Sequence, residues 1–215
     1  LDQCLAEKSK PDPLVSVIVP TYNRPDTLKK TLESIASQSY KRIEAVLVND
    51  AGEDVSTIVD AFRERLFIKY LVHKENKGLA AARNTAIKHT TGKYIAYLDD
   101  DDIFYEDHVE TLVNFLENND YKVAYTDAYR VWQEKENGRY VAKRKDFPYS
   151  FDFESDLILA QNLFPVLCIM HNKSCIDEVG LFDESLTTHE DWDLWIRMSR
   201  KYNFANIRKI TCEFA

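Results

Sequence analysis

Long hydrophobic runs are missing from this chain of 215 residues, since no stretch of about 18 consecutive apolar residues occurs. We therefore expect no membrane-spanning segment. The opening residues, LDQCLAEKSKPDPL, have neither a basic start nor an apolar core, so we expect no signal peptide. An initiator methionine is also missing, and we expect the sequence to be a piece of a longer protein.

Cysteine is scarce and shows no CxxC spacing, the four residues being Cys4, Cys168, Cys175 and Cys212. Neither a zinc site nor a disulfide framework is indicated. We expect reduced thiols and a cytoplasmic location, with the chain free, peripheral at a membrane or part of a larger protein.

Positive charge is in deficit, because 28 Lys and Arg stand against 36 Asp and Glu and give a net charge of −8. An acidic surface repels phosphate backbones, which argues against nucleic acid as a partner. An anionic ligand stays possible, because a bound metal ion can reverse the local field.

Strand and helix patterns alternate through the first half of the chain. Short apolar runs predict buried strands, and Asp26, Asp54 and Gly78 stand where the following helices begin. The predicted strands are 15–19, 43–48, 67–72 and 94–98. Repeated strand–helix units with short links indicate an α/β domain with a mainly parallel sheet.

The second half is less regular. We expect helices at 107–118 and 190–202, a hairpin of 122–133 with 139–143 around Asn137-Gly138, a loop at 145–153 and a strand at 166–170. The length fits one generous domain. We interpret 1–13 as a linker or tail and 14–215 as one domain, with a nucleotide-binding half at 14–103 and a more variable half at 104–215.

Polar residues follow each of the four predicted strands of the first half, where open parallel sheets bind ligands. The fourth strand ends in four aspartates, Asp99 to Asp102. Adjacent carboxylates repel one another unless solvent or a cation separates them. A solvated acidic face is the alternative. The position at a strand end favours oxygen ligation of Mg²⁺ or Mn²⁺ together with a phosphate-bearing substrate.

Five segments of the chain resemble, in order, the motifs of family-2 glycosyltransferases with the GT-A fold. They are VSVIVPTYNRPDTL, VLVNDAGED, ENKGLAAARNTAI, GKYIAYLDDDD and HEDWDLW. The resemblance covers residues 14 to about 202. It implies a nucleotide-sugar donor, most commonly UDP-linked, bound by the N-terminal half and a saccharide or lipid-linked acceptor bound by the C-terminal half. It also implies transfer with inversion, helped by Mn²⁺ or Mg²⁺.

The same resemblance assigns roles to individual residues. It implies that Pro20, Thr21 and Tyr22 line the nucleoside pocket, that Asp50 accepts a hydrogen bond from the base, and that Arg83 lies near the diphosphate. Asp100 would face the ribose or the metal, and Asp101 and Asp99 are the implied metal ligands. Asp191 is the implied general base, with Glu190 and His189 on the acceptor side. The aspartate run also permits the register Asp100/Asp102, and Asn49-Asp50 departs from the family's usual Asp-Asp pair.

Each of these residues has a purely structural alternative. Tyr22 could be a core aromatic, Asp50 a turn residue, Arg83 a surface partner of Glu75, and Asp191 a first-turn helix acid. Trp195 is expected in the core, and Trp192 either in the core or as a platform on which a sugar stacks.

Two other functions compete with glycosyl transfer. A sugar nucleotidyltransferase would need a glycine-rich phosphate loop after the first strand, where this chain has Pro-Thr-Tyr-Asn-Arg. The second is a catalytically silent carbohydrate- or nucleotide-binding domain, which the retained aspartates and Asp191 argue against.

Overall fold

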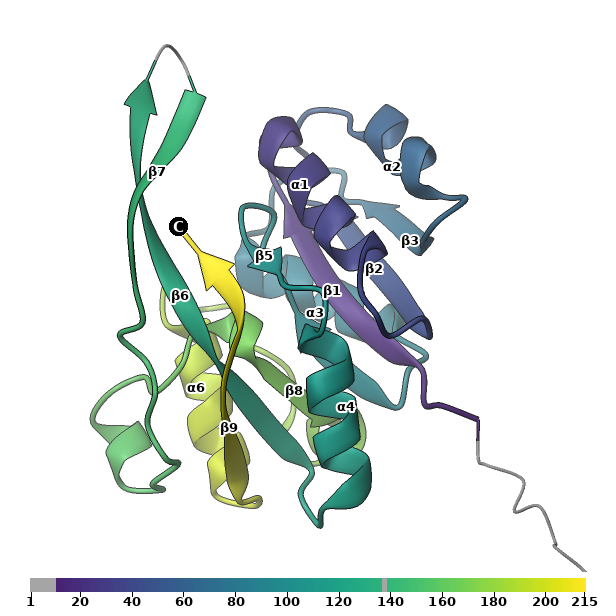
Figure 1. Ribbon diagram of the computed structural model, residues 1–215. Helices are drawn as coiled ribbons and strands as arrows, with labels where there is room; N and C mark the ends of the chain where they lie inside the picture. Colours follow the sequence, from purple (N-terminus) through teal and green to yellow (C-terminus); the bar gives the residue numbers. More distant parts are fainter. Residues whose placement is uncertain (1–10, 137–138) are drawn as a thin grey trace, which may run out of the picture.

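Four parallel strands form one half of a nine-stranded sheet in the computed structural model, which describes residues 11–136 and 139–215 (Figure 1). They are β1 (Val15–Thr21), β2 (Ile43–Asn49), β3 (Phe67–Val72) and β4 (Tyr94–Tyr97), ordered β3-β2-β1-β4. Helices α1 (Pro25–Ala36), α2 (Ser56–Phe62) and α3 (Leu79–His89) connect them. The βαβ pattern and the mainly parallel central sheet that the sequence predicts are confirmed.

The other half of the sheet is mixed. Strand β8 (Ile169–Asn172) runs antiparallel to β4 and β6, whereas β9 (Phe204–Phe214) runs parallel to β6. Strand β6 (Val123–Glu136) also pairs with β7 (Arg139–Asp146), and this hairpin extends beyond the rest of the sheet in Figure 1. The short strand β5 (Ile103–Phe104) pairs with β9 at the edge. Helices α4 (His108–Asn118), α5 (Ser174–Val179) and α6 (Glu190–Ser199) complete this half, with 3-10 turns at 157–159 and 166–168.

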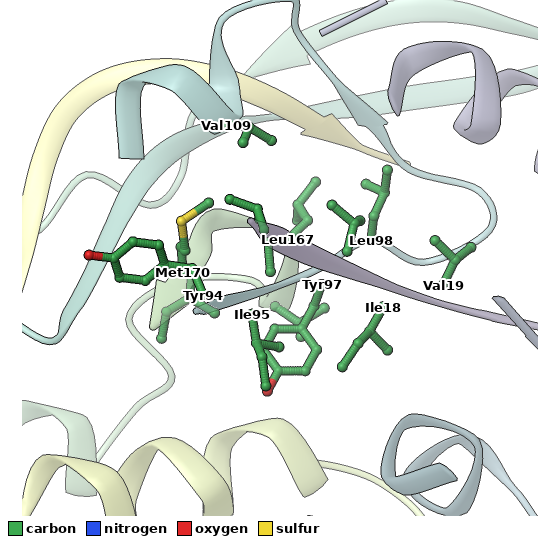
Figure 2. Close-up of a cluster of buried hydrophobic side chains, with 14 of the residues drawn as sticks. Ile18, Val19, Tyr94, Ile95, Tyr97, Leu98, Val109, Leu167 and Met170 are labelled. Atoms are coloured by element: carbon green, nitrogen blue, oxygen red, sulfur yellow. The ribbon is translucent and has the colours of Figure 1, made fainter. Parts of the chain in front are cut away.

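The core fills both faces of the sheet. Figure 2 shows Ile18, Ile95 and Tyr97 on one side of the central strands and Val19, Leu98 and Val109 on the other, because neighbouring residues of a strand point to opposite faces. The ring of Tyr97 packs edge-on against Trp195 of α6, at 5.6 Å between centroids. Helix α3 packs against β1 and β2. Burial on both faces explains why these strands read as continuous apolar runs.

Several predicted boundaries are wrong. Residues 166–168 form a 3-10 turn and the strand begins only at Ile169, while the predicted helix 190–202 ends at Ser199. Asp26 lies inside the first turn of α1 and does not cap it. Asp54 does accept a hydrogen bond from Ser56 N at 2.9 Å, at the start of α2. Strand β9, strand β5 and helix α5 were not expected.

The remaining predictions concern the termini and the cysteines. Cys168, Cys175 and Cys212 are buried free thiols, whereas Cys4 and the Asn137-Gly138 turn lie outside the described residues. None of the helices in the described part of the chain combines the length and apolarity that a bilayer crossing requires. The cytoplasmic location and the division at residues 103 and 104 stay predictions.

Candidate active site

The carboxyl ends of β1, β2 and β4 meet around a cavity of about 310 Å³, here called the nucleoside pocket. Its walls include six of the predicted residues: Pro20, Thr21, Tyr22, Asp50, Asp99 and Asp100. Asn76, Gly78 and Leu79 close it from the start of α3. The side chain of Tyr22 is 47% exposed, so it is not a core aromatic. The structure thus brings together the residues that the strand-end argument selects.

Asp50 is buried at the floor of this pocket and holds the loop that leads into α3. Its Oδ1 accepts hydrogen bonds from Lys77 N at 2.9 Å and from His73 Nδ1 at 2.6 Å, and its Oδ2 accepts one from Gly78 N at 2.8 Å. The other ring nitrogen of His73 lies 2.9 Å from Thr85 Oγ1. Since each carboxylate oxygen can accept two hydrogen bonds, one position on Oδ2 is left for a ligand.

His73 is a site residue that the sequence reasoning missed. It follows β3 by one residue and belongs to no motif with a fixed spacing. Its position just after a strand is the one sequence signal that could have indicated a site residue. Sequence reasoning selected residues 75–78 after this strand and passed over His73.

The four aspartates form a turn after β4 whose members have different partners. Asp100 is buried and accepts hydrogen bonds from Thr21 Oγ1 at 2.7 Å and Arg24 Nη1 at 3.2 Å. Asp101 accepts a hydrogen bond of 2.5 Å from the same Arg24 atom. Burial raises the pKa of both carboxyl groups, and the Arg24 charge works against this rise. The run is therefore not a uniformly solvated acidic face.

Arg83 is fully buried and joins the two halves of the chain. Its Nη1 donates to Glu190 Oε1 at 2.6 Å, and its Nη2 donates to Asp99 Oδ1 and Oδ2 at 2.8 and 2.9 Å. The alternative of a surface ion pair with Glu75 is wrong, because only 2% of the Arg83 side chain is exposed. The guanidinium therefore compensates two carboxylates that stand at the edge of a second cavity.

This second cavity, here called the acceptor cavity, has a volume of about 500 Å³. Asp99 and Leu79 line both it and the nucleoside pocket, so the two cavities adjoin at the aspartate turn. Its other walls include Asp101, Asp102, Tyr149, His189, Glu190 and Asp191. The predicted residues of the acceptor side thus share one cavity with the predicted metal ligands.

Asp191 lies in the first turn of α6. Its Oδ1 accepts a hydrogen bond from Trp192 N at 2.8 Å, and its Oδ2 is 3.4 Å from the amide of Asn162. Burial raises the pKa of Asp191, although the Arg83 charge lowers it. A carboxylate with a raised pKa in a cavity is suited to proton transfer near neutral pH.

The two tryptophans near Asp191 both pack in or against the core. Trp195 is buried and belongs to the core, as predicted. Trp192 is only partly buried and donates its indole N–H to Ile158 O at 2.6 Å. Its ring centroid lies 5.7 Å from that of His189, whose φ of 62° is left-handed. That backbone conformation is uncommon for a residue other than glycine and often marks functional loops.

The donor set of the acceptor cavity fits a hard divalent cation. Five carboxylates line it, and among the described lining residues the guanidinium of Arg83 is the only Lys or Arg charge. No group of three or more His, Cys, Asp and Glu side chains in the described ranges is arranged to hold a metal by itself. Mg²⁺ and Mn²⁺ commonly use one or two carboxylates plus substrate phosphates, so a cation that arrives with a diphosphate matches these residues.

Comparison with known proteins identifies the family. The model for Glycosyl transferase family 2 matches residues 16–176. The chain belongs to this family. A Bacillus subtilis relative described as the uncharacterized glycosyltransferase YwdF is 34% identical over 199 residues, which cover 92% of this chain and 71% of YwdF. The chain spans only 29% to 59% of the Rickettsia glycosyltransferases that it matches.

Several solved structures share the fold. TarS 1-349 of S. aureus in complex with UDP superposes with a TM-score of 0.78 at 22% identity, over 94% of this chain and 60% of that one. Mannosyltransferase PcManGT from Pyrobaculum calidifontis, in complex with GDP-Man and Mn²⁺, gives a TM-score of 0.71 at 20% identity, over 96% and 58%. These likenesses establish the GT-A-like fold of this family-2 domain.

Proposed function

We propose that this domain transfers a sugar from a nucleotide-sugar, with a UDP-linked sugar as the leading candidate, to a hydroxyl group of a saccharide or lipid-linked acceptor. The observation that carries the proposal is the shared wall of the two cavities: Asp99 borders the nucleoside pocket on one side and the cavity of Asp191 on the other. A nucleotide-sugar bound across this wall would place its sugar within the acceptor cavity.

The nucleoside pocket would bind the base and ribose of the donor. Asp50 has one free acceptor position on Oδ2, which suits a ring N–H such as that of uracil. Tyr22 lines the same pocket with an exposed ring that can stack on a base. TarS was solved with UDP, which supports this choice of nucleotide.

A divalent cation is part of the proposal, with Asp101 and Asp99 as its protein ligands and Mn²⁺ or Mg²⁺ as the ion. When bound, the ion would neutralise the negative charge of the departing diphosphate. Arg24 holds Asp101 in the structure, so its guanidinium would have to release that carboxylate. Arg83 keeps Asp99 in place from the buried side and stands close to where the diphosphate would lie.

Asp191 is proposed as the general base. It would take the proton of the acceptor hydroxyl while that oxygen attacks the anomeric carbon from the face opposite the diphosphate, which inverts the configuration. The raised pKa of Asp191 favours this role, since the efficiency of a base is greatest when its pKa approaches the working pH. Glu190 is held by Arg83, which leaves Asp191 as the more available carboxylate of the pair.

Donor binding and hydrolysis test the proposal. The protein would be screened for thermal stabilisation by UDP, GDP and their sugar conjugates with Mn²⁺, and a ligand at about 100 times its Kd should add about 2.7 kcal/mol to the free energy of unfolding. Slow hydrolysis of a bound nucleotide-sugar without acceptor would identify an enzyme. Binding without hydrolysis, and without transfer to any acceptor, would favour a silent binding domain instead.

A substitution of Asp50 tests separately whether this residue binds the nucleoside. Asp50→Ala should raise the KM for the nucleotide-sugar more than it lowers kcat, because Asp50 contacts the nucleoside equally in the ground and transition states. A collapse of kcat alone would contradict the assignment.

A further inference from the structure

A third cavity of about 600 Å³ lies beside the proposed active site, between the start of α1 and strand β6. Its walls include Asn23, Asp26, Thr27, Val131, Trp132 and Gln133. None of these six residues has a role in the function proposed above. The cavity therefore calls for its own explanation.

The third cavity adjoins both parts of the proposed active site. Arg24 lines it and the nucleoside pocket, and Asp101 lines it and the acceptor cavity. The Arg24–Asp101 ion pair, with 2.5 Å between Nη1 and Oδ2, thus stands where the three cavities meet. A molecule that extends out of the acceptor cavity past Asp101 would enter the third cavity.

Trp132 has partners for its ring and its indole nitrogen although half of the residue is exposed. Its side chain is 50% exposed, and its indole N–H points at Asp146 Oδ2 at 3.4 Å. The Arg130 guanidinium lies 4.7 Å from the centre of the ring, and Arg130 in turn makes two hydrogen bonds to Asp146 at 3.0 and 2.9 Å. Contacts on the ring and at its nitrogen set the orientation of this indole before any ligand arrives, which lowers the entropy cost of binding.

The chemistry of the walls suits a neutral carbohydrate. An aromatic face carries partial negative charge and attracts the C–H groups on the flat side of a sugar ring. Asp26, Gln133 and Thr27 offer oxygen and nitrogen atoms for hydroxyl groups. Arg24 also pairs with Asp100, and Asp26 adds a negative charge to the wall, so this cavity offers little attraction to a phosphate or another anion even when Asp101 is released to a metal ion.

We propose that the third cavity is a saccharide subsite in which Trp132 stacks on a sugar of the acceptor beyond the one that is glycosylated. The acceptor is then a chain of several neutral sugars rather than a monosaccharide. This inference rests on the proposed glycosyl transfer and adds the length and chemical class of the acceptor.

Direct binding tests the subsite without turnover. The probes are neutral oligosaccharides of glucose, galactose, mannose and N-acetylglucosamine, each with one, two and four residues, titrated by calorimetry and by tryptophan fluorescence. We expect at least a tenfold gain in affinity from one residue to four for a matching series. Trp132→Ala should abolish this gain, Trp132→Phe should keep part of it, and Phe67→Ala, which removes an exposed aromatic on β3, should leave it unchanged.

UDP binding by the same variants separates the two proposals. Unchanged UDP affinity with a lost length dependence supports the subsite. Oligosaccharide binding that Trp132→Ala does not alter, or UDP binding without binding of any oligosaccharide in the panel, overturns the subsite while donor binding stands. If the unaltered protein binds oligosaccharides in a length-dependent way but does not bind UDP, the transfer proposal is overturned and the third cavity remains a saccharide site.

Discussion

Arg83 donates two hydrogen bonds from one nitrogen to the two carboxylate oxygens of Asp99, at 2.8 and 2.9 Å. Arg83 donates a third hydrogen bond, at 2.6 Å, to Glu190, which belongs to the other half of the chain. The Arg83–Asp99 ion pair joins α3 to the turn after β4. Because Arg83 is buried, leaving one of these charges unpaired would cost stability.

Loss of Arg83 should therefore destabilise the fold. Arg83→Ala leaves two carboxylates without their cation, and we expect a loss of about 3–5 kcal/mol in the free energy of unfolding, measured by urea denaturation at pH 7. Arg65→Ala breaks an ion pair with Glu33 that solvent screens, and should cost far less. Equal losses in the two variants would argue that Arg83 has no special structural role.

Nucleotide binding should require a divalent cation if Asp101 is a metal ligand. Asp101→Asn removes the charge but keeps the shape, so we expect UDP affinity measured with Mn²⁺ to fall about tenfold or more, toward the value found with EDTA. Asp60→Asn removes a surface charge next to Arg63 and serves as the control. Calorimetry that gives the same UDP affinity with Mn²⁺ and with EDTA would exclude the metal assignment.

Asp191→Asn should separate binding from transfer. The amide can still hydrogen-bond to an acceptor hydroxyl but cannot take its proton, so the transfer rate should fall by about 10²-fold or more while donor affinity is kept. Asp193→Asn, on the same helix and paired with Arg197, provides the matched control. In the unaltered enzyme the acid limb of the pH–rate profile should lie above the ordinary aspartate pKa of about 3.9, because burial raises the pKa of Asp191. Near-normal transfer by Asp191→Asn would move the base to Glu190 or His189.

Glu44 should make stability depend on acidity below pH 4.5. Burial raises its pKa, but hydrogen bonds from Lys69, Ser16 and Thr91 outweigh this and lower the pKa from 4.5 to about 2. A lowered pKa stabilises the fold above the unfolded-state value, and that contribution is lost as the pH falls from 4.5 toward 2. The difference in unfolding free energy between the natural protein and Glu44→Gln should shrink by about 2 kcal/mol between pH 6 and pH 3. A difference that is constant over this range would contradict the assignment.

Sequence patterns predicted the first half well because its signals are local. Strands β1, β2 and β4 are buried along their whole length, and β1 is followed by a helix whose buried residues recur at helical spacing. Strand β9 was missed because FANIRKITCEF mixes charged and apolar residues without strict alternation, and its pairing with β6 shifts register twice. Helix α5 has only six residues, too few for a periodic pattern.

The sequence predicted several residues of the candidate site but not the hydrogen bonds between them. Strand-end position and family resemblance selected Asp50, Asp101 and Asp191, and the structure places each on a cavity wall. The Arg83–Glu190 hydrogen bond joins residues 107 positions apart, and no spacing rule predicts such a contact. Trp132 lies on a strand, where an exposed aromatic residue is common. Only the fold shows that Trp132 and Asp101 line the same cavity.

The pairing of β5 with β9 has a consequence for the order of folding. The aspartate turn leads directly into β5, which forms its ladder with residues 212–213, and the next residue, Tyr105, donates its backbone N–H to Thr211 O at 2.8 Å. Strands β1 to β4 all lie within the first 97 residues, whereas this edge needs a segment about 110 positions further along the chain. During synthesis from the N-terminus, the walls of the nucleoside pocket that β1, β2 and α3 supply can form well before the aspartate turn is anchored by β9. The site thus reaches its final geometry only once β9 has emerged and docked.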